Sequence, residues 1–316
     1  MNRGISFLSV VVPTYNEEEN VEQLHSGLAL ALSKLGLPYE VIYVDDSSTD
    51  STFGKLERIY KDDDRVKVIR HRRNLGQTEA LVTGFKNAKG DVIVTIDADL
   101  QHDPADIGKL LEQILQGADA VIGWRTNRRE SFLTRTIPSR LANFLGRTLL
   151  GVEIHDFGCG LKAYGAECIR DIIVEGEGHL FLPAAVAARG YKVVEVKISD
   201  RVRGSGSSKF GLNMMRRQVL DLIFFWFLVR YWRRPLHFFG TIGIVLMVLG
   251  LIAGVVQLLR FVFLNPTTLM TPLLLMATFL VLIGIQFISL GLLFEVEMRP
   301  HARVFDTRPA IILSHE

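Results

Sequence analysis

The chain has 316 residues, a formal net charge of +2, 2 cysteines and a mean hydropathy of +0.25. The low cysteine content excludes a disulfide scaffold, and the small net charge gives no reason to expect a nucleic-acid partner. The mean hydropathy is high for a chain in which 22% of residues are charged, so the apolar residues must be concentrated in one region.

Short β-branched runs alternate with segments of helical apolar spacing along the first part of the chain. Strands are predicted over Ser6–Val12, Tyr39–Val44, Val66–Ile69, Val92–Ile96 and Ala120–Ile122, and helices over Glu18–Leu35, Asp50–Tyr60, Thr78–Ala88 and Pro104–Gln116. This alternation predicts an α/β domain with a mostly parallel, Rossmann-like sheet and helices on both faces. Ligands in such folds bind at the carboxyl ends of the strands, so the residues that follow each strand are the candidates for function.

The segment after the fourth predicted strand carries the most specific chemistry. Asp97 and Asp99 leave the strand end at alternate positions, and the amide of Gln101 follows. Carboxylate and amide oxygens are the donors that hard cations prefer, so the pattern predicts an Mg²⁺ or Mn²⁺ site; the alternative is a solvated acidic loop. No strand is followed by GxGxxG or by GxxxxGK[ST], which disfavours a dinucleotide dehydrogenase and a P-loop enzyme.

A membrane region follows the polar part of the chain. Within Pro235–Phe294 the only charged residue is Arg260. Two spans are predicted, at about 236–259 and 273–294, each long enough to cross ~30 Å of hydrocarbon. The alternative is a pair of buried core helices.

Basic residues lie before the first span and after the second, whereas Arg260 is the only basic residue near the segment that joins the two spans. The positive-inside rule therefore predicts that both flanks are cytoplasmic. The segment 213–234 is apolar and aromatic with Arg near both ends, which indicates an interfacial helix. The amino terminus has no signal-peptide pattern, so the expected location is the cytoplasmic membrane, with the polar domain in the cytoplasm. Gly250 and Gly254 form a GxxxG motif that permits a homo-oligomer without establishing one.

Five motifs, in order, carry a family resemblance. VVPTYNEEEN, VDDSSTD, RNLGQTEAL, DADLQHDP and a later Arg-x-x-Gly-x-Ser-Lys resemble the inverting GT-A glycosyltransferases of family 2. Within these, the chain is similar to the polyprenyl-phosphate glycosyltransferases, the group that contains dolichol-phosphate mannose synthases and bactoprenol glucosyltransferases. On this basis we expect a GT-A domain over 1–212, the interfacial helix over 213–234, a transmembrane hairpin over 235–298 and a cytoplasmic tail over 299–316.

The resemblance implies a role for each matching position. It implies nucleotide contacts for Pro13, Tyr15, Glu17, Asp45, Asp46 and Asp97; metal contacts for Asp97, Asp99 and Gln101; and acceptor-phosphate contacts for Arg125, Arg135, Ser139, Arg203 and Lys209. It also implies that Asp156 lies at the reacting centre with Asp99 and Arg125, where it either takes a proton or orients a substrate.

Several of these positions have a structural alternative. Tyr15 is also consistent with a core aromatic, Asp46 with a helix cap and Arg135 with a surface salt bridge. His179 is consistent with a sugar contact or a packed helix-start histidine, and His102 with a functional residue or a solvated loop histidine.

The implied reaction is metal-dependent, inverting transfer of a hexose from a nucleoside-diphosphate sugar (GDP-mannose or a UDP-sugar) to a dolichyl or undecaprenyl phosphate in the membrane bilayer. Two positions depart from the family pattern: Trp124, where a Ser is frequent, and Ser207, where a basic residue is often seen. The alternatives are a processive polysaccharide synthase, whose Gln-x-x-Arg-Trp motif is not found, a non-catalytic partner of a lipid-sugar flippase, and a nucleotidyltransferase.

Overall fold

The computed structural model describes residues 4–126, 154–169, 178–180, 182–199, 226–227, 231, 234–263 and 272–298. The chain divides into two compact units between Trp226 and Phe227, and each is described by itself. Most of the predicted interfacial helix over 213–234 and the whole tail over 299–316 lie outside the described residues.

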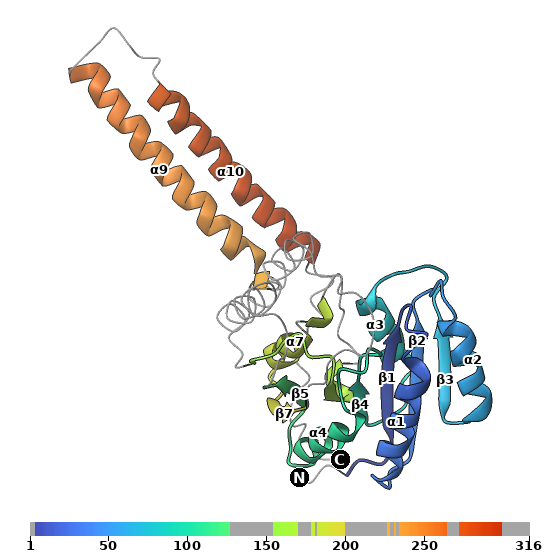
Figure 1. Ribbon diagram of the computed structural model, residues 1–316. Helices are drawn as coiled ribbons and strands as arrows, with labels where there is room; N and C mark the ends of the chain where they lie inside the picture. Colours follow the sequence, from blue (N-terminus) through green and yellow to red (C-terminus); the bar gives the residue numbers. More distant parts are fainter. Residues whose placement is uncertain are drawn as a thin grey trace, which may run out of the picture. The chain divides into compact units, whose positions relative to one another are not determined.

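The first unit is built on a seven-stranded sheet with the order β3-β2-β1-β4-β6-β5-β7 (Figure 1). The strands are β1 Leu8–Thr14, β2 Tyr39–Asp45, β3 Val66–Arg70, β4 Val92–Thr95, β5 Ala120–Arg125, β6 Lys162–Gly165 and β7 Val193–Ile198. The five predicted strands are confirmed with shifted ends, and the sheet is largely parallel as expected. The sequence did not predict β6 and β7, and β6 is antiparallel to both of its neighbours, β4 and β5.

Helices cover both faces of this sheet, which is why every residue of β1 and β2 is buried. The helical elements are α1 Val21–Ser33, α2 Thr52–Asp62, α3 Gln77–Asn87, η1 Pro104–Asp106, α4 Ile107–Leu115, α6 Ala166–Ile169, η3 Gly178–Leu180 and α7 Leu182–Ala188. Alternate residues of β1, such as Val10, share one buried core with α1, α2 and α4. The intervening residue Val11 contacts α3 at Gly84, on the opposite face.

The topology brings chain segments that are distant in sequence to one edge of the sheet. Strands β1 to β4 are parallel to one another. Strand β5 points the same way as β4, because β4 and β5 each pair antiparallel with β6. Lys162, the first residue of β6, is paired with Thr95 near the carboxyl end of β4 and with Ile122 of β5. The loops after β1, β2, β3 and β4 therefore lie at one edge of the sheet, and the segment 154–161, which leads into β6, contacts the loop after β4 there.

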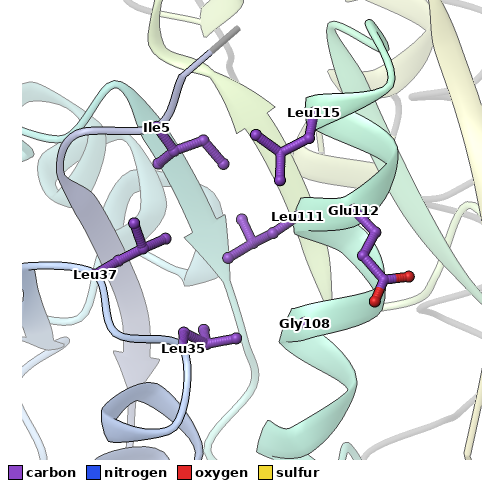
Figure 2. Close-up of a pocket in the computed structure, with 7 residues that line it drawn as sticks. All are labelled: Ile5, Leu35, Leu37, Gly108, Leu111, Glu112 and Leu115. Atoms are coloured by element: carbon purple, nitrogen blue, oxygen red, sulfur yellow. The ribbon is translucent and has the colours of Figure 1, made fainter. Parts of the chain in front are cut away.

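The opposite edge has a different character. A hollow of about 260 Å³ lies there, lined by Ile5, Leu35, Leu37, Gly108, Leu111, Glu112 and Leu115 (Figure 2). The segment before β1, the turn between α1 and β2, and one side of α4 form its walls. Glu112 is the one charged residue among those seven, so the lining of this hollow offers few polar groups.

The second unit holds two long apolar helices, α9 Pro235–Phe263 and α10 Pro272–Met298. Both are long and apolar enough to cross a membrane, and only 17% and 11% of their most apolar windows are buried. This exposure argues against the alternative of core helices, which would be covered by protein. Glu295 of α10 accepts a hydrogen bond from the Leu236 amide (3.3 Å), so a carboxylate caps the positive end of α9.

Glycines allow close packing of α9 against α10. A Cβ at Gly284 would lie 2.6 Å from the Gly243 carbonyl oxygen, and one at Gly250 would lie 2.8 Å from the Ala277 carbonyl oxygen. A Cβ at Gly254, in contrast, would have no atom within 4 Å. Of the predicted GxxxG pair, Gly250 is therefore used inside the hairpin and only Gly254 faces open space.

Candidate active site

Asp97 and Asp99 lie immediately after β4, at the edge where the strand ends meet. Asp99 is buried (6% exposed), and its Oδ1 accepts the Gln101 amide N–H at 3.1 Å. Asp97 is half-buried, and its Oδ1 accepts a hydrogen bond from Gln77 Nε2 at 2.8 Å, at the start of α3. The burial of Asp99 and this fixed contact at Asp97 argue against a freely solvated acidic loop.

Gly160 packs directly against the Asp97 carboxylate. A Cβ at this position would lie 2.0 Å from Asp97 Oδ2 and 2.2 Å from its Cγ, which is far inside van der Waals contact. Only glycine leaves room for the carboxylate here. Asp97 is thus held between Gln77 on one side and the backbone of the 154–161 segment on the other.

Three of the site loops contain a non-glycine residue in the left-handed backbone region. These are Asn16 (φ 56°) after β1, Ser47 (φ 63°) after β2 and Leu100 (φ 62°) after β4. Leu rarely adopts this conformation, and such strained positions cluster at functional sites. The conformation at Leu100 falls between Asp99 and Gln101, in the segment predicted to bind metal.

The loops predicted to hold the nucleotide are tied to one another. Asn16 Oδ1 accepts the Thr49 amide (2.8 Å), and Thr52 Oγ1 accepts the Glu17 amide (2.8 Å). Pro13 is buried in β1, whereas Tyr15 is only half-buried, so Tyr15 is not a core aromatic. The loops after β1 and β2 therefore form one framed surface.

Asp45 and Asp46, at the end of β2, are both buried and both paired. Asp45 forms an ion pair with Arg70 Nε (3.2 Å). Asp46 accepts the amides of Leu75 (2.8 Å) and Gly76 (2.7 Å) and pairs with His71 Nδ1 (2.8 Å). Asp46 thus fixes the loop that leads into α3 and is not the cap of α2, whose N-cap residue is Ser51.

Arg125 and Asp156 form a bidentate ion pair. Arg125 Nε donates to Asp156 Oδ2 at 2.7 Å and Nη2 donates to Oδ1 at 3.0 Å. Asp156 is 2% exposed, and the Arg125 side chain is 11% exposed. Such a fork fixes the plane of the guanidinium group, which favours the orienting role for Asp156 over proton transfer.

His102 is buried among charged groups and is not a solvated loop histidine. Its Nε2 accepts the Gly160 amide at 3.2 Å, which places the proton of the neutral ring on Nδ1. Burial, together with the nearby Arg125 charge, lowers the pKa of His102 to about 4, and Asp99 and Asp156 are close enough to oppose that shift. A neutral His102 therefore links the metal-loop segment to the backbone beside Asp97.

Lys162 is a site residue that the sequence did not single out. It is 5% exposed, and burial lowers its pKa to about 8, against the opposing effect of the nearby Asp97 and Asp156. Its Nζ donates to the carbonyl oxygen of His179 (3.1 Å), and His179 Nδ1 is bonded to Thr78 Oγ1 (2.7 Å). These contacts match the packed alternative for His179. Only the antiparallel pairing of β6 brings Lys162 here, and no local pattern in the sequence predicts that pairing.

The remaining predicted positions fall outside the described residues. These are the acceptor-phosphate candidates Arg135, Ser139, Arg203 and Lys209, together with Ser207. Across the described part of the chain, no three His, Cys, Asp or Glu side chains gather as a metal cage. The donors available for a cation at this edge are the carboxylates of Asp97 and Asp99 and the amide of Gln101, which suit Mg²⁺ or Mn²⁺.

The model of the family Glycosyl transferase family 2 matches residues 9–173, which include β1 to β6 and the segments that carry Asp97, Arg125 and Asp156. The chain belongs to glycosyl transferase family 2. It is therefore a glycosyltransferase, and the resemblance carried by the five motifs is confirmed.

Two relatives of this family 2 enzyme have names that state their substrates. It is 36% identical over 304 residues to the dodecaprenyl-phosphate galacturonate synthase of Rhizobium johnstonii, covering 94% of this chain and 89% of the relative. It is 33% identical over 295 residues to the undecaprenyl-phosphate 4-deoxy-4-formamido-L-arabinose transferase of Edwardsiella ictaluri, covering 93% and 89%. The similarity thus extends through α9 and α10.

Solved structures support the GT-A fold. The glucosyl-3-phosphoglycerate synthase of Mycobacterium tuberculosis, in complex with Mn²⁺, UDP and glucosyl-3-phosphoglycerate, matches with a TM-score of 0.55 and 21% identity. The match covers 70% of this chain and 80% of that chain. At this identity, the likeness establishes the fold alone.

Proposed function

We propose that this family 2 enzyme transfers a sugar from a nucleoside-diphosphate sugar to the phosphate of a polyprenyl phosphate, with inversion at the anomeric carbon. The observation that carries the proposal is the proximity of Asp97 and Asp99 to the Arg125–Asp156 pair: His102 lies near Asp99, Arg125 and Asp156, and Lys162 lies near Asp97, Arg125 and Asp156. Carboxylates suit a cation and its diphosphate, and a guanidinium suits an acceptor phosphate. The two named relatives act on prenyl phosphates, and two apolar helices would keep the enzyme beside such lipids.

In this proposal the donor nucleotide lies on the framed surface of the loops after β1 and β2. Tyr15 is half-buried and offers a ring face to the base. The carboxylates of Glu17, Asp45 and Asp46 either accept hydrogen bonds from base N–H groups or hold in place the loops that surround the base. Pro13 lies in β1, one residue before the end of the strand from which the first of these loops starts. The diphosphate extends toward Asp97, where the strand ends meet.

Asp97, Asp99 and Gln101 would hold Mg²⁺ or Mn²⁺. When bound, the cation would offset negative charge on the departing diphosphate. Gln77 and Gly160 keep Asp97 in one place, and His102 secures the same loop to Gly160. These contacts preorganise the site before any substrate arrives.

The acceptor phosphate is proposed to bind at Arg125, with Arg135, Ser139, Arg203 and Lys209 completing the site. One phosphate oxygen forms a bond to the anomeric carbon while the bond from that carbon to the donor diphosphate oxygen breaks. Attack from the opposite face inverts the configuration. The phosphate is already anionic at pH 7, so Asp156 orients Arg125 and need not take a proton.

The membrane placement is also a proposal. We propose that α9 and α10 form a transmembrane hairpin in the cytoplasmic membrane, with the GT-A domain and the carboxyl terminus in the cytoplasm. Basic residues flank both spans on one side, whereas Arg260 alone lies at the hairpin end. The donor is expected to reach the site from the cytoplasm and the acceptor from the inner leaflet.

The test is product formation by the purified full chain in detergent. Undecaprenyl phosphate and Mn²⁺ would be supplied with UDP-galacturonate, UDP-glucose, UDP-N-acetylglucosamine or GDP-mannose, and lipid-linked sugar detected by mass spectrometry. The panel includes a uronate because the named relatives do not share a single sugar. Asp99→Asn should abolish transfer, whereas Asp103→Asn, in the same loop but outside the proposed metal set, should keep most of it.

Three results would contradict the proposal. Metal-dependent nucleotide binding without transfer to any prenyl phosphate would remove the lipid acceptor. Release of pyrophosphate would indicate a nucleotidyltransferase. Full transfer by Asp99→Asn in EDTA would remove the metal role.

A further inference from the structure

Glu195, on the edge strand β7, contacts the segment that carries Asp156. Its Oε1 accepts the amide N–H of His155 at 2.7 Å and that of Asp156 at 3.2 Å. Its Oε2 lies 2.7 Å from His155 Nδ1, which donates because a carboxylate can only accept. The side chain of Glu195 is 9% exposed and that of His155 is 43% exposed, so the contacts are charge-assisted and are covered on the Glu195 side.

The His155 ring is held from a second direction. It stacks on Trp124 with ring centroids 4.4 Å apart and an interplanar angle of 15°. Lys197 Nζ lies 5.5 Å from the centroid of the same indole ring. Trp124 precedes Arg125 in β5, and Lys197 is two residues beyond Glu195 in β7. Trp124, where the family often has Ser, is thus part of a packed support.

A continuous set of contacts therefore runs from β7 to Arg125. Glu195 binds two successive backbone amides, and the second is that of Asp156, whose carboxylate forms the bidentate ion pair with Arg125. A shift of the Asp156 backbone would move both carboxylate oxygens, and the guanidinium plane would follow them. Strands β5 and β7 are paired in register, with Ile122 opposite Glu195, so the support stands on the same sheet as Arg125.

We infer that Glu195 is a positioning residue for the acceptor phosphate, acting through the Asp156 backbone and the Arg125 guanidinium. The inference rests on the proposed function, in which Arg125 binds that phosphate. It predicts a defect in the use of the acceptor that is separate from nucleotide binding.

The test compares Glu195→Ala with Glu40→Ala. Glu40 is a matched control because its carboxylate is also largely covered and accepts one backbone amide (Lys89, 2.8 Å) and one side-chain donor (Ser9 Oγ, 2.7 Å). It lies near the amino end of β2, away from the site. Steady-state kinetics would be measured with varied undecaprenyl phosphate, and the Kd of UDP with Mn²⁺ by titration.

We expect Glu195→Ala to lower kcat/KM for the lipid phosphate by about 10- to 100-fold, the scale of an ångström-sized misplacement. The Kd of UDP should stay within about twofold. Glu195→Gln, which keeps an oxygen for the two amides, should restore most of the acceptor kinetics. Glu40→Ala should lower Tm without this selective loss.

Equal effects of Glu195→Ala and Glu40→Ala, confined to Tm, would overturn the inference. So would a Glu195→Ala loss that appears equally in the Kd of UDP. Arg125→Ala distinguishes failure of the proposed acceptor role of Arg125 from failure of the positioning role of Glu195. If it transfers sugar at the wild-type rate, the acceptor role of Arg125 itself fails; if it is inactive while Glu195→Ala is normal, only the inference about Glu195 fails.

Discussion

Substitution of Gly160 by Ala tests whether the position of the Asp97 carboxylate controls catalysis. The new Cβ would lie 2.0 Å from Asp97 Oδ2 and 2.6 Å from Oδ1. An ordinary carbon–oxygen contact is about 3.4 Å, so the carboxylate must retreat by about 1.4 Å or the 154–161 backbone must move. Retreat of the carboxylate would disrupt the 2.8 Å hydrogen bond from Gln77 to Asp97, whereas movement of the backbone would displace the segment that carries Asp156.

The expected loss of activity follows from the size of this displacement. A misplacement of about 1 Å at a reacting centre costs about 100-fold in rate, and overpacking costs about 1–3 kcal/mol of stability. We therefore expect Gly160→Ala to lower kcat about 100-fold and to raise the Mn²⁺ concentration needed for half-maximal activity, with a small fall in Tm. Both would be measured on the detergent-purified chain by lipid-product formation across a Mn²⁺ titration.

Gly158 provides the matched control in the same segment. A Cβ there would lie 3.7 Å from Arg125 Nη2 and 3.8 Å from Asp156 Oδ1, which are ordinary contacts. Gly158→Ala should therefore retain activity within a few-fold. Wild-type rates for Gly160→Ala would refute the reasoning, as would equal losses in the two variants, because the predicted clash is confined to Gly160.

Three further predictions concern stability. The pKa of His102 falls from 6.5 to about 4 on folding, so between these pH values the unfolded chain binds a proton that the folded chain does not. The free energy of unfolding should therefore fall by about 3 kcal/mol as the pH drops through this window. Urea unfolding at a series of pH values would measure this fall, and His102→Gln should make the free energy of unfolding less dependent on pH. Asp46→Asn removes a charge that binds two loop amides, and we expect the free energy of unfolding in urea to fall by about 1–3 kcal/mol, together with weaker UDP binding. An unchanged urea midpoint would contradict the role of Asp46 in fixing the loop that leads into α3. Gly284→Leu should separate α9 from α10 and lower Tm in detergent, whereas Gly254→Leu, in open space, should not; similar Tm values for both would argue against the hairpin packing.

The sequence by itself determined the class of the enzyme and the order of its elements as far as β5. Strand and helix periodicities are local properties, so the alternation up to β5 is readable without a structure. Asp97 and Asp99 were predicted from their place after an apolar strand, and the two long helices from an uncharged run. Each of these signals lies within a few consecutive residues.

The family resemblance implied that Arg125 and Asp156 share one site, but only the tertiary structure decided which distant side chains make direct contact. Arg125 and Asp156 are separated by 31 residues, and Glu195 and His155 by 40, yet both pairs are in direct contact. The reversed direction of β6 brings Lys162 to the site, and the close approach of Gly160 to Asp97 depends on the same pairing. Hydropathy and spacing carry no information on such contacts, because they arise from strand register and from the space between packed backbones.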